Sequence, residues 1–140
     1  ELNLAWCAGF FDGEGCIHLA KRRAVQWPWS FHVELSINNT SKCAMTRWVD
    51  TFGGKCYILK VGFGINGHKK KQAYGWSACG QRAVRVLRQL LPALLVKRPE
   101  AEIALQYCEL SWRGKRKRTG EQYNIDCNFN ATLKRLKRVA

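Results

Sequence analysis

The first stretch of the chain is apolar on nearly every side. Leucine, alanine, tryptophan, cysteine and phenylalanine fill most of residues 2–12, with no continuous polar stripe between them. This pattern predicts a helix that is buried all round. We expect the helix to end at the turn Gly13-Glu14-Gly15, where glycine permits a positive φ. In a chain of 140 residues, one side of such a helix can pack on the chain's own core and the other side on a second subunit.

Residues 30–38 show a different pattern, in which apolar and polar side chains alternate strictly. A period of two predicts a strand with one side buried and the other in solvent. Three further strands are predicted over residues 16–23, 55–63 and 72–79. The polar side of the resulting sheet is expected to carry His18, Arg22, Ser30, His32, Glu34, Ser36 and Lys60.

Helices are predicted at residues 42–52, 81–91 and 100–111, with a short one at 130–138. Pro92 closes the second of these, and Pro99 suits the first turn of the third. The order of elements predicts an α+β fold, αββαββα, in which helices cover one face of a four-stranded antiparallel, saddle-shaped sheet. The length favours a single domain over residues 1–140, with a core at 1–112 and a basic extension at 113–140.

Charge indicates the kind of partner. Twenty-four Lys and Arg residues against ten Asp and Glu give a net charge of +14. So strong an excess weakens the compact state by self-repulsion and indicates a polyanionic partner. The alternative is a surface that serves only solubility, for which acids are more effective than bases. No apolar run has the length of a membrane span, so we expect no membrane association.

The seven cysteines contain no C-x-x-C pair, which argues against a structural zinc site. Their odd number and the absence of a signal-peptide pattern predict reduced thiols in an intracellular protein. The cytoplasm or nucleoid of a prokaryote and an organelle both fit this prediction. Disulfides stay open as an alternative, since proteins of hyperthermophiles contain them inside the cell.

Two carboxylates, Asp12 and Glu14, lie at the predicted C-terminal end of the apolar helix. That end carries a partial negative charge and carbonyl groups without partners, so acids are unfavourable there unless a cation compensates them. Carboxylate oxygens, together with a backbone carbonyl such as that of Gly13, are ligands that suit Mg²⁺. In the alternative interpretation, Asp12 accepts hydrogen bonds from backbone amides and Glu14 is solvated.

The segment Cys7-Ala8-Gly9-Phe10-Phe11-Asp12-Gly13-Glu14-Gly15 resembles the signature of the LAGLIDADG homing endonucleases. Ala8, Gly9, Asp12 and Gly15 match letters of the motif, two phenylalanines replace its apolar pair, and a glutamate takes the place of its second acid. Residues 37–40 and the end of the next helix at 52–55 resemble the segment that follows in the family. Residues 91–97 resemble the turn before its active-site lysine. The resemblance fades after Trp112.

Membership of the single-motif, homodimeric branch of that family would imply a site-specific homing endonuclease. It would hydrolyse both strands of a long, pseudo-palindromic double-stranded DNA target and leave 3′ overhangs, and it would be intron-encoded. The implied cofactor is Mg²⁺, with Mn²⁺ as a substitute and Ca²⁺ binding without supporting cleavage. An intron-RNA splicing maturase and a non-cutting DNA-binding protein of the same fold are the alternatives.

The resemblance also implies roles for individual residues. Glu14 would bind the catalytic metal, and Asp12 would be mainly structural while assisting the site. Lys97 would organise the attacking water and stabilise charge at the cleaved phosphate. Asn39 would position solvent near the metal, with Asn38 as the alternative if the alignment slips by one residue. A solvated lysine and a helix N-cap are the ordinary alternatives for Lys97 and Asn39, and Thr40 or Ser41 competes for the N-cap.

DNA contacts are expected from two kinds of residue. The polar side of the sheet, with Asn38 at its end, would reach base edges in the major groove. There Glu34 would accept a hydrogen bond from a cytosine amino group or hold Arg22. Cations in loops and on the surface would contact phosphates, namely Lys69, Lys70, Lys71, Lys115, Arg116 and Lys117. The dimer interface would contain Trp6, Ala8, Gly9 and Phe10, because small residues let two motif helices approach closely.

Overall fold

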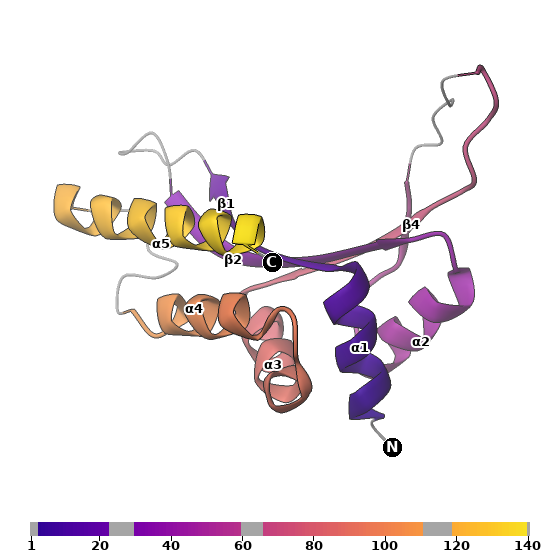
Figure 1. Ribbon diagram of the computed structural model, residues 1–140, viewed down its shortest axis with the longest axis horizontal. Coiled ribbons are helices and arrows are strands. Elements are labelled where there is room, and N and C mark those ends of the chain that lie inside the picture. The colour runs from indigo at the N-terminus through magenta and orange to yellow at the C-terminus, as the bar shows by residue number, and fades with distance from the viewer. Residues whose placement is uncertain (1–2, 23–29, 60–65, 111–118, 140) are drawn as a thin grey trace.

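The computed structural model describes residues 3–22, 30–59, 66–110 and 119–139 of the chain (Figure 1). In sequence order the elements of these residues are α1 (Leu4–Glu14), β1 (Gly15–Arg22), β2 (Ser30–Asn39), α2 (Lys42–Phe52), β3 (Tyr57–Ile58), β4 (Tyr74–Cys79), α3 (Gly80–Leu90), the 3₁₀ turn η1 (Leu91–Ala93), α4 (Arg98–Cys108) and α5 (Gly120–Val139). The strands form one antiparallel sheet in the order β1-β2-β4-β3. The predicted α+β fold with a four-stranded antiparallel sheet is therefore confirmed.

The two faces of the sheet differ as the alternation along its strands predicts. Ile17, Val33 and Leu35 point to one face and are at most 4% exposed. The residues between them, such as His18 and Glu34, are partly exposed on the other face. Figure 1 shows α1, α2, α3 and α4 on one side of the sheet, while α5 runs beside β1 and α4. The helices thus cover the apolar face. We call the opposite, polar face the open face.

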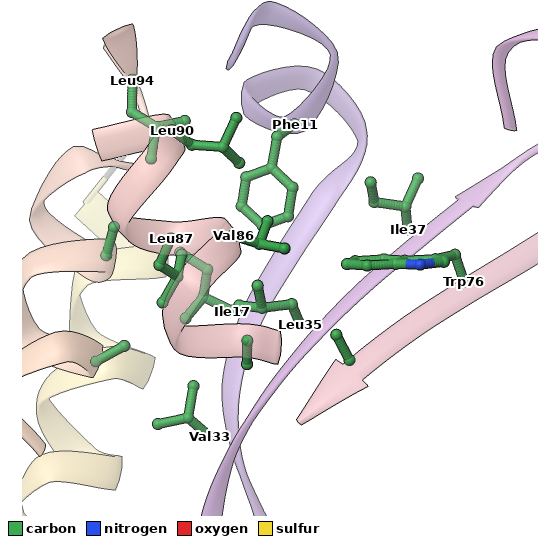
Figure 2. Packing of buried hydrophobic residues seen from close by; sticks show 14 of the residues in the cluster. Phe11, Ile17, Val33, Leu35, Ile37, Trp76, Val86, Leu87, Leu90 and Leu94 are labelled. Atoms are coloured by element: carbon green, nitrogen blue, oxygen red, sulfur yellow. The ribbon is translucent and has the colours of Figure 1, made fainter. Parts of the chain in front are cut away.

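Helix α1 enters the core along one side. Phe11 stacks on Trp48 of α2 with ring centroids 5.9 Å apart, and Trp48 meets Trp76 of β4 edge-on at 5.4 Å. The Trp76 indole donates from Nε1 to the Gly53 carbonyl oxygen, 2.9 Å away. In Figure 2, Phe11 lies between Trp76 on the sheet side and Leu90 on the α3 side. Burial of each such side chain stabilises the fold by roughly 1.5–3 kcal/mol, so packing fixes where α1 ends relative to the sheet.

The end of α1 lies two residues later than predicted. The helix continues through Gly13 and Glu14, and neither Gly13 nor Gly15 has a positive φ. Gly15 serves a different purpose, because a Cβ built there would lie 2.5 Å from the Phe11 ring. Both motif acids therefore sit in the last helical turn, and strand β1 follows without a loop.

The third predicted strand is only partly described by the structure. Of residues 55–63, only Tyr57–Ile58 forms a strand among the residues that the structure describes, and residues 60–63 lie outside them. Tyr57 and Ile58 are 43% and 73% exposed. Backbone contact with the neighbouring segment continues one residue further, where Leu59 N donates to the Ala73 carbonyl oxygen at 3.0 Å.

The last helix is longer than predicted. Instead of residues 130–138 it covers 20 residues from Gly120. A capping box begins it, in which Gln122 N donates to Thr119 Oγ1 at 3.1 Å and Thr119 N donates to Gln122 Oε1 at 3.0 Å. Leu133 is 1% exposed and belongs to the same core as α1 and the sheet. The predicted extension therefore helps to build the core.

Two negative findings apply to the described part of the chain. None of its helices combines the length and hydropathy that crossing a membrane requires. All seven cysteines lie within it, and no disulfide joins any two of them.

Candidate active site

Asp12 joins the end of α1 to the segment that precedes α4. Its Oδ2 accepts a hydrogen bond from the Leu95 amide and its Oδ1 accepts one from the Lys97 amide, each at 2.8 Å. The Lys97 ammonium in turn donates to the Asp12 carbonyl oxygen. An ionised acceptor strengthens the first two bonds, and the ammonium offsets the negative end of the helix dipole. These three bonds, which we call the Asp12 clamp, hold Lys97 against the end of α1. The alternative interpretation of Asp12, as an acceptor of backbone amides, is confirmed.

Glu14 is the acid of the pair that stays open to solvent. It is the last residue of α1 and is exposed, as is Gly13. Within the described residues, no three His, Cys, Asp or Glu side chains gather as a metal site would require. The Glu14 carboxylate and the Gly13 carbonyl are nevertheless hard oxygen donors, and Mg²⁺ commonly takes only one or two carboxylates from a protein and completes its shell with water and phosphate. The donors at the end of α1 therefore fit Mg²⁺, while both oxygens of Asp12 already accept hydrogen bonds.

Lys97 lies in the wall of a cavity of about 440 Å³ between β1, α4 and α5. Glu100, in the first turn of α4, is only 7% exposed. Burial raises the pKa of the Glu100 carboxyl above its usual range, and the charges of Lys137 and Lys97 oppose this shift. The lining residues are Gly15, Cys16, Val96, Lys97, Pro99, Glu100, Leu136 and Lys137. Two ammonium groups and a buried acid thus surround the space beside the Asp12 clamp.

The two asparagines at the end of β2 have different surroundings. Asn39 Oδ1 accepts a hydrogen bond from Ser41 N at 2.7 Å, and Ser41 Oγ caps α2 by accepting from Ala44 N at 3.2 Å. The side-chain oxygen of Asn39 is therefore engaged in the turn before α2, while Ser41 is the N-cap. The register pairs Gly15 with Ile37 and so brings the exposed Asn38 close to the end of α1. Of the two, Asn38 is better placed to reach solvent beside Glu14.

The open face carries a cluster of His18, Glu34 and His32, which we call the His–Glu–His cluster. Glu34 Oε1 lies 3.4 Å from His18 Nε2, and Glu34 Oε2 lies 3.5 Å from His32 Nε2. The register places His18 opposite Glu34 but Arg22 opposite Ser30. Glu34 therefore contacts the two histidines, while the predicted pairing with Arg22 is not tested, because the side chain of Arg22 lies outside the described residues.

The other predicted DNA contacts have varied positions. Ser36 is half-buried on the open face, opposite Cys16 and Ser77. Residues 69–71, the three lysines before β4, are exposed on a segment that rises on the open side of the sheet in Figure 1. Outside the described residues lie Lys60, Lys115, Arg116, Lys117 and the side chains of Arg22 and Ser30. Sequence reasoning missed Ser77 and Cys79, which β4 adds to the exposed positions.

The side of α1 that faces away from the core is made of small residues. Ala5, Gly9 and Gly13 are exposed at successive intervals of four residues. Ala8, predicted at a dimer interface, is only 1% exposed and packs in the core instead. Trp6 and Phe10 flank this outer side and are half-buried. Their rings stack on each other at 5.1 Å, and Phe10 also contacts Trp48 at 5.8 Å.

Two large apolar side chains are exposed in the segment that joins the end of α1 through Asp12. Leu95 and Val96, in the segment held by the Asp12 clamp, are 84% and 59% exposed. They are among the few large apolar residues of the described chain that lie mainly in solvent. The outer side of α1 and this segment are therefore two exposed apolar surfaces, and the Asp12 clamp joins the segment to the end of α1.

No protein-family model matches the sequence, and no curated protein matches it. Solved structures match over almost the whole chain. The homing endonuclease I-CvuI, in complex with a DNA target, matches with a TM-score of 0.70 and 19% identity over 95% of this chain and 80% of its own. The homing endonuclease I-TnaI matches with a TM-score of 0.67 and 18% identity over 99% of this chain and 95% of its own. The LAGLIDADG homing endonuclease I-GzeII, in complex with its DNA target, matches at 0.52 and 12% identity, over 76% of this chain and 35% of its own.

The chain has the LAGLIDADG homing endonuclease fold. At these levels of identity the matches establish the fold, and they confirm the resemblance that residues 7–15 carry. In the LAGLIDADG fold of this chain, α1 is the motif helix and the sheet presents its open face on the side away from α1–α4.

Proposed function

We propose that the chain is a site-specific DNA endonuclease of the LAGLIDADG type, which hydrolyses both strands of duplex DNA with a divalent metal as a homodimer. The observation that carries the proposal is the end of α1, where an exposed Glu14 adjoins a lysine that the Asp12 clamp holds in place. Asp12 is compensated by Lys97 and by backbone amides, whereas the exposed Glu14 is a second carboxylate at the negative end of the helix, where a metal cation is favourable.

Each residue of the site has a role in this proposal. Glu14 and the Gly13 carbonyl would hold Mg²⁺, which supplies Lewis-acid stabilisation of phosphate charge when bound. Asp12 orients the backbone of residues 95–97 and with it Lys97. The Lys97 ammonium can donate to a phosphate oxygen, which stabilises the negative charge that develops there during hydrolysis. Asn38 would orient solvent at the edge of the site.

The outer side of α1 supports the proposed homodimer. A glycine inside a helix costs about 0.5–1 kcal/mol relative to alanine. Within the described part of the chain, nothing lies within 4 Å of a Cβ built at Gly9, and its φ is not positive. The chain itself therefore does not require a glycine at this position, whereas a closely packed second copy of α1 would. That copy would also cover Leu95 and Val96 and would bring a second Glu14 for the second strand.

The resemblance to the family adds finer features to the proposal. A two-fold dimer would read a long, pseudo-palindromic target through two open faces, with exposed lysines on the phosphates. We further propose 3′ overhangs, an intron-encoded origin, substitution of Mn²⁺ for Mg²⁺, and binding without cleavage in Ca²⁺. Each is separate from the endonuclease activity and is measured separately, by mapping cleaved ends and by exchanging the metal.

The test is linearisation of a supercoiled plasmid that carries a target selected from randomised duplexes, with Mg²⁺ and without it. We expect cleavage in Mg²⁺ and none in EDTA. Glu14→Gln should lower the cleavage rate by at least about 10²–10³-fold while DNA binding persists. Glu109→Gln, a matched change at an exposed glutamate outside the site, should cleave like the wild type. Binding without cleavage in any metal would instead identify a non-cutting relative, and full activity of Glu14→Gln would refute the metal assignment.

A further inference from the structure

The His–Glu–His cluster changes the sign of its charge on protonation. With both imidazoles neutral, Glu34 leaves the cluster negative. With both imidazoles protonated, the cluster is positive. The side chains of His18, His32 and Glu34 are 36%, 19% and 31% exposed, although the His32 Nε2 atom is itself buried, so water screens the charges of the cluster only in part. A ligand that approaches the open face therefore meets a charge that depends on pH.

The groups around the cluster come from three elements. Cys16 Sγ lies 3.9 Å from His18 Nδ1 on β1, and Lys137 of α5 reaches Cys16 Sγ at 3.4 Å. On β4, Cys79 is the register partner of Glu34. The hydrogen bond with Cys16 is the main cause that raises the pKa of His18, and Glu34 acts in the same direction, while desolvation and Lys137 act against them.

Duplex DNA is a polyanion, and its phosphates repel an uncompensated carboxylate. On a surface that meets DNA, Glu34 is favourable when it accepts a hydrogen bond from a cytosine amino group, or when its charge is neutralised. The geometry supplies two groups for this purpose, since each carboxylate oxygen already faces one imidazole nitrogen. The negative potential of DNA would in turn favour the protonated form of both rings.

We propose that the open face takes up protons on His18 and His32 when it binds duplex DNA, so that its affinity rises as the pH falls through the imidazole range. This rests on the proposed DNA-binding function and adds a proton-linked contact to it. In the bound state Glu34 holds both imidazolium rings toward the duplex. By linkage, each proton taken up changes the dissociation constant about tenfold per pH unit.

The first experiment titrates the histidines without DNA. The sequence has three, and His68, exposed in the segment before β4, is an internal control. Proton NMR of the ring C–H signals, assigned with His18→Gln and His32→Gln, gives the titration curve of each. Glu34→Gln should shift the curves of His18 and His32 to lower pH and leave that of His68 unchanged. Equal curves in the wild type and Glu34→Gln would overturn the coupling.

The second experiment measures binding of fluorescent duplexes with a randomised centre, in EDTA at constant ionic strength, at about pH 6 and about pH 8. We expect the wild-type dissociation constant to rise by about tenfold or more between them. The double variant His18→Gln/His32→Gln should lose most of this rise. His68→Gln should keep it, and Cys16→Ser, which removes the thiol but neither ring, should keep a rise as well.

The outcomes separate this inference from the proposed function. Binding that is independent of pH in the wild type, or a rise that persists in the double variant, overturns the proton-linked contact while DNA binding stands. Loss of the rise in Cys16→Ser, with the NMR titration curve of His18 unchanged in that variant, assigns the proton to the thiol and also overturns it. Absence of binding at both pH values overturns the proposed function and this inference together.

Discussion

The inner and outer sides of α1 are both apolar, but they differ in burial. On the inner side, Cys7, Ala8 and Phe11 are at most 1% exposed and form part of the core. On the outer side, Ala5 and Gly9 lie in solvent with no described residue over them. A helix that is apolar all round thus has one surface that packs in the core and another that is exposed, where we propose that a second chain packs.

The two motif acids repeat this contrast two residues apart. Asp12 is half-buried and fully engaged by the segment before α4, whereas Glu14 is exposed. In the proposed function, Asp12 therefore contributes to stability and Glu14 to the chemistry. Four substitutions test the two sides of α1 and the roles of the residues at its end. They are given from the largest expected effect to the smallest.

Phe11→Ala should lower the free energy of unfolding by about 3–5 kcal/mol, because it removes a ring that is fully buried against Trp48. Denaturant unfolding measures the change. Ala5→Ser, on the outer side of the same helix, is the matched control and should change stability by less than about 0.5 kcal/mol. Equal losses in the two variants would remove the distinction between the sides.

Lys97→Met should lower the cleavage rate about 10²-fold and change DNA affinity much less, because the ammonium stabilises charge that develops during hydrolysis. Single-turnover cleavage and binding in Ca²⁺ separate the two effects. Lys134→Met, at an exposed position on α5, controls for the loss of one positive charge. A variant that loses affinity and keeps its rate per bound complex would make Lys97 a phosphate contact only.

Asp12→Asn should lower the free energy of unfolding by about 1.5–3 kcal/mol, since its amide group replaces one acceptor of the clamp with a donor that faces a backbone N–H. Thermal unfolding compares it with Glu14→Gln, which should leave stability nearly unchanged. Comparable losses of stability in both variants would contradict the assignment of separate roles.

Gly9→Leu should weaken self-association by about 1–3 kcal/mol through overpacking between two α1 helices, while the fold of each chain persists. Sedimentation analysis at several concentrations measures the association, and circular dichroism checks the fold. Ala131→Leu, an exposed position on α5, provides a matched increase in size. A wild-type chain that stays monomeric while it cuts DNA would remove the basis of this prediction.

The elements that could be predicted from the sequence are those determined by residues close together in the chain. Strict alternation at residues 30–38 identified a strand, and α2 has the bounds that were predicted, because Ser41 caps it and Gly53 ends it. The capping box at Thr119 and Gln122 is also local and could have identified the start of α5.

Other features depend on contacts that no local pattern contains. When a helix is apolar all round, its sequence does not show which side faces the core. Ala8 was therefore predicted at the interface, although it is buried. The partners of Asp12 lie 83 and 85 residues away along the chain. The partners of Glu34 depend on the register of two strands. The alternation in the sequence predicts on which face of the sheet Glu34 lies, but not which residue of the neighbouring strand lies opposite it.

The long sequence separation of the Asp12 clamp has a consequence for biosynthesis. A ribosome adds about 5–20 residues per second, so the motif helix emerges several seconds before the segment around Leu95 that engages Asp12. During that interval the nascent chain exposes an apolar helix, and Asp12 at its end lacks its partners Leu95 and Lys97. Until its distant partner is translated, this helix is a binding target for chaperones and a hazard for premature association between neighbouring nascent chains.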